Sequence, residues 1–314
     1  MRLLKLIPET PSFNFASKRI AAFVFSAFLI VASIGSFAVN GLNLGIDFLG
    51  GILIEAETNG PADVTSMRRQ LGGLGLGDVS IQEFGDDNTV LIKVQRQEGN
   101  AEAQQAAVTL VKETLATQVA EYRRTELVGP TVGAELQEAA LWAVLSAVGA
   151  ILIYIWFRFE WQFGVGAVIA LSHDVITTIG LFSLLGLEFN LATVAAILTI
   201  AGYSINDTVV VYDRIRENMR KFKVMDFIEL YNLSINQTLS RTVMTSVTTL
   251  IALLALFVFG GEVIRGFSIA LIWGVIIGTY SSIALAGPIL TYMEPNRGTD
   301  EEEYPGSKKD DASA

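Results

Sequence analysis

Six apolar runs, each long enough for a helix to cross a membrane, dominate this sequence of 314 residues. A bilayer core needs about 20 apolar residues in helical conformation. The runs are residues 20–39, 139–157, 162–187, 189–212, 242–261 and 267–293. Charged residues make up only 17% of the chain, against about 25% in soluble domains. The sequence therefore predicts an α-helical integral membrane protein with six transmembrane helices.

The first run, residues 20–39, also has features of a secretory signal peptide, since Ser36-Phe37-Ala38 matches a small-residue cleavage site. The run is longer than the apolar core of a signal peptide, which has about 7–15 residues. Five further runs follow it. We therefore expect an uncleaved membrane anchor.

Basic residues predict the orientation, because short cytoplasmic loops carry an excess of Lys and Arg. They gather before the first run and in alternate loops: Arg2, Lys5, Lys18, Arg19, Arg158, Arg214, Arg216, Arg220, Lys221 and Lys223. We expect residues 1–19 to be a cytoplasmic N-terminus. The five later helices lie within residues 139–293, and residues 294–314 form an acidic cytoplasmic tail with a composition typical of disorder.

The long loop, residues 40–138, falls on the opposite side of the membrane and contains alternating apolar segments typical of strands. Residues 85–88 form a turn signal between two of them. The expected elements are strands at 52–58, 79–84, 89–94 and 122–128, and helices at 63–71 and 101–120. This βαββαβ order is typical of a ferredoxin-like α+β domain.

Composition excludes several kinds of active site. The chain has no Cys and one His, so disulfides, thiolate chemistry and sites with two imidazoles are excluded. The glycine-rich loop at residues 72–76 lacks the Lys-Ser/Thr of a nucleotide-binding loop. A net charge of −10 argues against a nucleic-acid surface. We expect no enzyme, no cofactor, no metal and no nucleic-acid partner.

One carboxylate and one guanidinium fall at membrane depth. Asp207 lies six residues before Asp213, the first acidic residue clearly outside the fourth run, which corresponds to about 9 Å along a helix. Arg241 begins the fifth run. An Asp at the bilayer centre costs about 2.5–3.5 kcal/mol and usually has a function. Two interpretations remain open, a carboxylate that binds and releases a proton, and a static ion pair between the fourth and fifth helices.

A second polar pair, His173 and Asp174, lies near the middle of the third run. The pair either extends a polar path or contains a buried acid that is hydrogen-bonded to a nearby hydroxyl. The candidate hydroxyls are Thr177, Thr178 and Ser204. Asn206, beside Asp207, is a further candidate for this polar path, although we expect it to form a hydrogen bond between helices rather than to bind a ligand.

Charges alternate in sign where the fourth run leaves the membrane, in the motif Asp213, Arg214, Arg216 and Glu217. A solvated helix face and a cytoplasmic gate are both compatible with this pattern. In the sixth run, Gly274 and Gly278 form a GxxxG motif that predicts close helix contact.

Three motifs together are similar to one known family. They are residues 44–51 (LGIDFLGG), residues 128–133 (VGPTVG) and residues 202–218 (GYSINDTVVVYDRIREN). This combination resembles the SecF family of bacterial protein-translocase subunits, within the resistance–nodulation–division superfamily of proton-driven transporters. The likeness covers roughly residues 10–293, and the acidic tail lies outside it.

The resemblance implies a partner and a task. The partner is SecD, with a second set of six helices, and the pair would associate with the SecYEG channel and YajC in the bacterial inner membrane. It implies that the proton-motive force is used to complete the export of unfolded preproteins. A proton-driven exporter of small molecules or lipids and a passive translocon scaffold are the alternatives.

The resemblance also implies roles for particular residues. The family's proton-pathway Asp and Arg match Asp207 and Arg241, and a further Asp is expected from SecD. We expect movement to be transmitted near the glycine-rich segments, whose residues are Asp47, Gly50, Gly51, Gly129 and Pro130. Asp47 has an equal alternative as a simple turn or cap residue.

Overall fold

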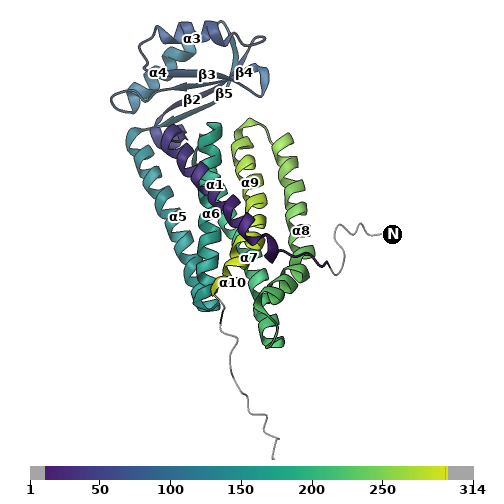
Figure 1. Ribbon diagram of the computed structural model, residues 1–314. Coiled ribbons are helices and arrows are strands. Elements are labelled where there is room, and N and C mark those ends of the chain that lie inside the picture. The colour runs from purple at the N-terminus through teal and green to yellow at the C-terminus, as the bar shows by residue number, and fades with distance from the viewer. Residues whose placement is uncertain (1–10, 294, 296–314) are drawn as a thin grey trace, which may run out of the picture.

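The computed structural model describes residues 11–293 and residue 295. Figure 1 shows a bundle of long helices with a small α/β domain at one end. Residues 1–10 of the expected cytoplasmic N-terminus, and residues 294 and 296–314 of the expected acidic tail, lie outside the described residues.

Six helices or helix pairs within the described residues are long and apolar enough to cross a membrane, which confirms the predicted fold class. They are α1 (Arg19–Asn40), α5 (Pro130–Arg158), α6 (Trp161–Leu185), α7 (Leu191–Lys221), α8 (Phe227–Phe259), and α9 (Arg265–Ser281) with α10 (Gly287–Met293). A π-helical segment, Ser282–Ala286, joins α9 to α10.

Two of these helices begin well before their apolar runs. Helix α5 begins at Pro130, with Gly129 as its N-cap, and proline at the first helical position is favourable because its missing N–H needs no partner there. Helix α8 begins at Phe227, and the Asp226 side chain accepts a hydrogen bond from Ile228 N. Apolarity therefore located the membrane-embedded part of each helix but not its end.

Helices α6, α7 and α9 form the centre of the bundle. About half of their most apolar residues are buried, whereas those of α1, α5 and α8 are mostly exposed. Phe163 of α6, Tyr212 of α7 and Tyr231 of α8 are among the largest fully buried side chains. The buried polar groups described below therefore lie mainly on these central helices, and α1, α5 and α8 lie around them.

The domain at one end of the bundle, called the outer domain below after its expected side of the membrane, contains a four-stranded antiparallel sheet in the order β3-β4-β2-β5. Its elements are β2 (Gly51–Thr58), α3 (Val64–Gly72), β3 (Val79–Phe84), β4 (Asp86–Val94), α4 (Ala101–Thr114) and β5 (Val119–Val128). This is the βαββαβ order that the sequence predicted. Helix α4 is shorter than expected because Val119 already pairs with β2.

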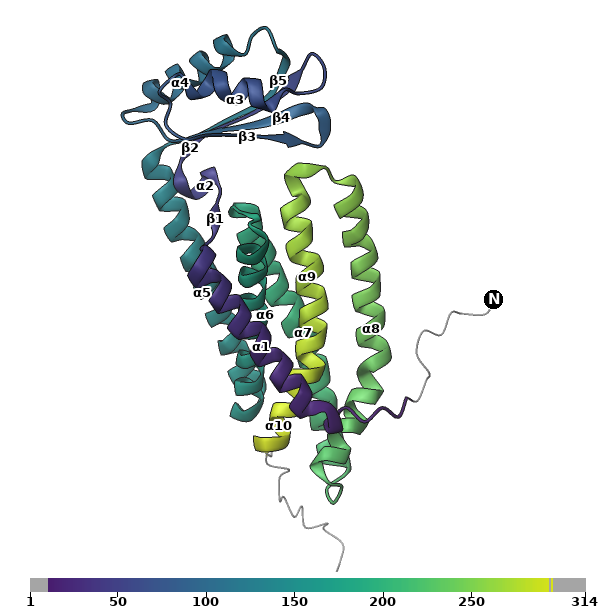
Figure 2. The same ribbon diagram turned by 45° about the horizontal axis from the view of Figure 1, so that its top comes forward.

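The two faces of this sheet have different neighbours. Helices α3 and α4 cover one face, and the other faces the helix bundle (Figure 2). Ile52, Ile54 and Ile92 pack with Met67 of α3 and Val111 of α4 in the domain core. Alternation along a strand sends Leu53 and Leu91 to the other face. The domain therefore presents a partly apolar surface toward the membrane helices.

A short connection fastens the domain to the bundle. Strand β1 (Asn43–Leu44) pairs in parallel with β6 (Glu188–Phe189), which lies between α6 and α7. Helix α2 (Ile46–Leu49) follows β1 and lies below the sheet in Figure 2. Lys93 of β4 also forms an ion pair with Glu188. The domain is thus attached to the α6–α7 loop as well as to its own flanking helices.

Candidate functional site

Asp207 is held by hydroxyl groups from two other elements. Its side chain on α7 is 8% exposed. Thr242 Oγ1 of α8 donates to Asp207 Oδ1 at 2.7 Å, and Ser282 Oγ of the π-helical segment donates to Asp207 Oδ2. Arg241 is exposed, and the described side chains include no ion pair between it and Asp207.

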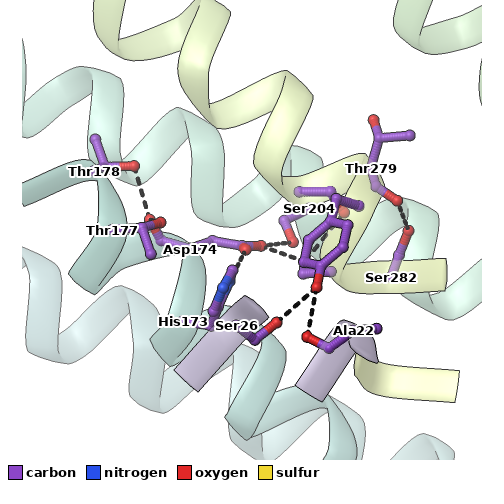
Figure 3. A network of polar contacts seen from close by, with 12 residues as sticks. Ala22, Ser26, His173, Asp174, Thr177, Thr178, Ser204, Thr279 and Ser282 are labelled. Atoms are coloured by element: carbon purple, nitrogen blue, oxygen red, sulfur yellow. Dashed lines mark hydrogen bonds and ion pairs between the residues drawn. The ribbon is translucent and has the colours of Figure 1, made fainter. Parts of the chain in front are cut away.

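Asp174 on α6 is fully buried and has three side-chain partners. Ser204 Oγ of α7 donates to its Oδ2 at 2.5 Å, and Ser281 Oγ of α9 donates to the same oxygen at 2.7 Å. His173 Nδ1 lies 3.0 Å from Oδ1. Figure 3 shows these contacts converging on the carboxylate from three helices.

The threonines near Asp174 do not bind its carboxylate. Thr177 and Thr178 donate to the backbone carbonyl of Asp174, at 3.2 and 2.7 Å. A Thr hydroxyl in a helix commonly bonds a carbonyl three or four residues back. Of the three hydroxyls that the sequence suggested, only that of Ser204 contacts the carboxylate.

His173 connects this cluster toward α1. Its ring is fully buried, and its Nε2 has no hydrogen-bond partner among the described residues. The ring centroid lies 6.1 Å from that of Tyr280 on α9. Tyr280 donates to the carbonyl of Ala22 at 2.8 Å, and its hydroxyl lies 2.9 Å from Ser26 Oγ (Figure 3). A ring contact between His173 and Tyr280 therefore lies between the Asp174 cluster and the hydrogen bonds from α9 to α1.

Sequence reasoning missed Ser281 and Ser282, although two consecutive serines in a long apolar run are a visible signal. The GxxxG motif explains how these serines come within range of α7. A side chain at Gly274 would collide with Ile200, and a Cβ at Gly278 would lie 3.1 Å from Ser204 Cβ. Because both glycines lack a side chain, α9 lies close enough to α7 for Ser204 and Ser281 to share one carboxylate.

Helices α7 and α8 also have exposed polar residues on a face that points away from the bundle. Asn206 is exposed and forms no hydrogen bond within the described chain, so it makes no interhelical contact here. Other small or polar residues of these helices are exposed near Asp207: Thr199, Gly202, Arg241, Thr245 and Thr248. The described part of the chain leaves this face uncovered.

The charged motif after Asp207 divides between two environments. Asp213 forms an ion pair with Arg158 of α5 at 2.7 Å, and Arg216 donates to the Arg158 carbonyl at 3.1 Å. The guanidinium groups of Arg158 and Arg216 both lie over the Phe159 ring. Arg214 and Glu217 instead pair along α7 itself, at 3.0 Å. Half of the motif therefore fastens α7 to α5, and half lies on the helix surface.

Asp47 contacts the outer end of α7. Its Oδ2 accepts a hydrogen bond from Leu191 N at 2.9 Å, and Leu191 is the first residue of α7. A carboxylate in this position satisfies a free N–H and interacts favourably with the helix dipole. Asp47 thus helps to cap α7, a helix far away in the sequence, beside the regular N-cap residue Asn190.

The glycines near Asp47 permit a close approach of the backbone. Gly51 has a φ of +133°, and a Cβ there would lie 2.7 Å from Val94 O. Gly50 has a φ of +71°, and its own Cβ would lie 3.2 Å from Val128 O. Gly129 and Pro130 begin α5 directly after β5. These four residues therefore lie at the junction of the sheet with α2 and α5.

A cavity of about 630 Å³ separates the sheet from the outer ends of the helices. Its wall includes Leu53, Leu91 and Lys93 from the sheet, and Glu188 and Phe267 from the membrane helices and their loops. The wall is therefore mixed in polarity and belongs to both parts of the molecule.

Two family models match this chain. "Protein export membrane protein SecD/SecF, C-terminal" matches residues 108–296, and "SecD/SecF GG Motif" matches residues 35–62. The second range contains Gly50 and Gly51.

Curated relatives match nearly the whole chain. The protein translocase subunit SecF of Cereibacter sphaeroides is 46% identical over 315 residues, covering 98% of this chain and 95% of the relative. That of Rickettsia bellii is 48% identical over 292 residues, covering 92% and 95%.

Solved structures show the same fold in a longer chain. SecDF from Thermus thermophilus, titled a translocon-associated membrane protein, is 38% identical with a TM-score of 0.83. SecDF in a super-membrane-facing form is 37% identical with a TM-score of 0.68. Each match covers 93% of this chain but only 40% of the SecDF chain. The chain belongs to the SecD/SecF family of protein export membrane proteins.

Proposed function

We propose that this chain is an accessory subunit of the Sec translocase and that, with SecD, it uses the proton-motive force to promote preprotein export. The chain would cross the bacterial inner membrane with both termini in the cytoplasm. The observation that carries the proposal is Asp207, a nearly buried carboxylate inside an apolar bundle with hydroxyl partners. Full-length SecF relatives and the SecDF structures support the export role.

The partners of Asp207 suit a group that changes protonation state. Thr242 and Ser282 donate to the carboxylate, and a hydroxyl can also accept a hydrogen bond from a protonated carboxyl group. A guanidinium has only donors and would favour the ionised state alone. A hydrogen-bond partner is therefore present for both states of Asp207.

Arg241 is suited to a partner outside this chain. An exposed guanidinium at membrane depth is costly unless protein or water covers it. We propose that the SecD helices cover the exposed face of α7 and α8 that contains Asn206 and Arg241, and that a SecD carboxylate faces Arg241. The proton pathway would then consist of Asp207, Arg241 and that carboxylate, with His173 and Asp174 extending it.

The ends of α7 are suited to transmit the resulting movement. Asp47 joins the outer end to the segment that leads into the sheet, and Asp213 joins the inner end to α5. We propose that protonation of Asp207 shifts the membrane helices and that the outer domain follows. The domain would act on unfolded preproteins leaving the SecYEG channel, in a complex that includes YajC.

The energy available per proton is modest. One elementary charge crossing 100 mV releases about 2.3 kcal/mol. Moving a long polypeptide therefore requires many cycles, each coupled to a small displacement.

The test is pulse-chase export of a secreted preprotein in cells depleted of this protein. The cells are rescued with wild type, Asp207→Asn or Ser268→Ala at matched membrane levels. Ser268 is a buried polar residue of α9 that donates to the Ile264 carbonyl and does not contact Asp207. We expect rescue by wild type and Ser268→Ala but not by Asp207→Asn, which retains the shape of the side chain but cannot bind and release a proton.

The alternatives give different outcomes. Rescue by Asp207→Asn would support a passive scaffold. Normal export after depletion would remove the export role and favour a proton-driven exporter of small molecules or lipids.

A further inference from the structure

Two buried carboxylates on different helices are contacted by two consecutive serines. Ser281 ends α9 and donates to Asp174 of α6, while Ser282 begins the π-helical segment and donates to Asp207 of α7. Consecutive helical residues point about 100° apart, so each serine faces a different neighbouring helix. Single turns of π-helix are rare and occur frequently at functional sites.

Each serine has a second acceptor of its own. Ser281 Oγ lies 3.1 Å from the carbonyl of Gly278, and Ser282 Oγ lies 3.1 Å from the carbonyl of Thr279. Each hydroxyl can therefore donate to an ionised carboxylate, or turn to its carbonyl and accept from the protonated acid. Asp174, like Asp207, therefore has a serine hydroxyl that can either donate to its carboxyl group or accept from it.

We propose that Asp174 is a second carboxyl group that gains and loses a proton during the transport cycle, and that its protonation is coupled to that of Asp207 through the Ser281–Ser282 pair. This inference rests on the proposed function. It assigns Asp174 a role of its own, beyond that of a fixed joint between helices.

Asp174 is surrounded by hydroxyl groups and an imidazole rather than by a cation in the described part of the chain. The titratable groups facing it are His173 on α6, Tyr280 on α9 behind the imidazole, and Asp207 farther along α7. Ser204 is its partner on α7, and Ser26 of α1 contacts the Tyr280 hydroxyl. Among the described residues, no Lys or Arg pairs with Asp174. An ionised carboxylate without a cation is costly in an apolar interior.

The His173 ring is the nearest group that could provide a positive charge beside Asp174. Its Nδ1 faces Asp174, while its Nε2 is buried with no partner among the described residues. A protonated imidazole would leave a buried N–H unsatisfied at Nε2. A neutral ring leaves only an uncharged nitrogen unpaired there, which costs less, so the contacts of His173 do not make it a cation partner for Asp174.

The experiment is infrared difference spectroscopy across a pH series. It uses the full-length chain in complex with SecD in lipid vesicles, and it detects the carbonyl stretch of protonated carboxyl groups. The variants are Asp174→Asn, Asp207→Asn, Ser281→Ala and Ser268→Ala. Ser268 is a matched control, since it is a fully buried serine of α9 that donates to the Ile264 carbonyl and contacts neither carboxylate.

We expect a band that grows as the pH falls and disappears in Asp174→Asn. Its midpoint pH should move in Asp207→Asn and in Ser281→Ala but stay unchanged in Ser268→Ala. If Asp174→Asn does not assemble, a band that Ser281→Ala displaces and that persists in Asp207→Asn identifies the Asp174 signal. A spectrum in which no titrating band is lost in Asp174→Asn or displaced in Ser281→Ala would overturn the inference.

Failure of this inference is distinguishable from failure of the proposed function. If Asp207→Asn supports normal export, the proposed function fails whatever the Asp174 band does. If Asp207→Asn abolishes export while no band responds to Asp174→Asn or Ser281→Ala, the export role and the Asp207 pathway stand, whereas the extension through Asp174 fails and Asp174 is only a structural joint.

Discussion

Asp47 and Leu191 are 144 residues apart in the chain, yet the Leu191 N–H donates to the Asp47 carboxylate at 2.9 Å. The contact joins the segment below the outer sheet to the first turn of α7, the helix that carries Asp207. Any displacement of α7 along its axis therefore acts directly on the segment that leads into β2.

Removing this cap is expected to weaken the outer end of α7. Asp47→Ala should lower stability by about 0.5–1.5 kcal/mol, the usual net contribution of one hydrogen bond, because the N-cap residue Asn190 remains. Hydrogen exchange of the first α7 amides should increase. The control is Asp63→Ala, which removes the cap of α3 at Ser66 N and should affect the domain alone. Unchanged hydrogen exchange in Asp47→Ala would show that this hydrogen bond does not stabilise the first turn of α7.

The close approach of α7 and α9 depends on Gly274. A methyl group there would meet the Ile200 side chain, so Gly274→Ala should cost about 1–3 kcal/mol by overpacking. Gly149→Ala is the matched control, since a Cβ at Gly149 of α5 has no neighbour within 4 Å. Thermal unfolding in detergent compares the two variants. Equal midpoints would mean that α9 can move away without penalty.

The ion pair between Lys93 and Glu188 is expected to hold the outer domain against the bundle. Charge reversal in Lys93→Glu places two carboxylates together and should separate the domain from the α6–α7 loop. The double variant Lys93→Glu with Glu188→Lys should restore the contact. Spin-label distances between β4 and the loop measure the separation. If the distance distribution is the same in all three proteins, β1–β6 pairing alone sets the position of the domain.

The ion pair Arg158–Asp213 should contribute little to stability. Its side chains are 43% and 45% exposed, and exposed pairs are typically worth about 0.2–1 kcal/mol. A double-mutant cycle with Arg158→Ala and Asp213→Ala measures the coupling, which added salt should reduce. A coupling well above this range, insensitive to salt, would contradict the interpretation as a surface contact. The pair Arg214–Glu217 within α7 serves as the reference.

The fold could be read largely from sequence because its signals are local. Each transmembrane helix satisfies its own backbone hydrogen bonds, so the apolar runs at residues 162–187 and 267–293 identify helices without knowledge of their neighbours. Alternation with period two identifies strands in the same way. Helix ends outside the membrane were missed, as at Phe227, since capping depends on single polar residues such as Asp226.

The sequence by itself determined that Asp174 and Asp207 lie at membrane depth, because the apolar residues around each one require it. Only the tertiary structure decided which groups hold them. Thr177 and Thr178 were near in sequence but bond the backbone, and Ser281 is a partner from 107 residues away. Arg241 faces outward, while its neighbour Thr242 faces Asp207. The reason is physical, since a side chain's depth follows from its place along one helix, whereas its partners follow from the rotation and close approach of several helices at once.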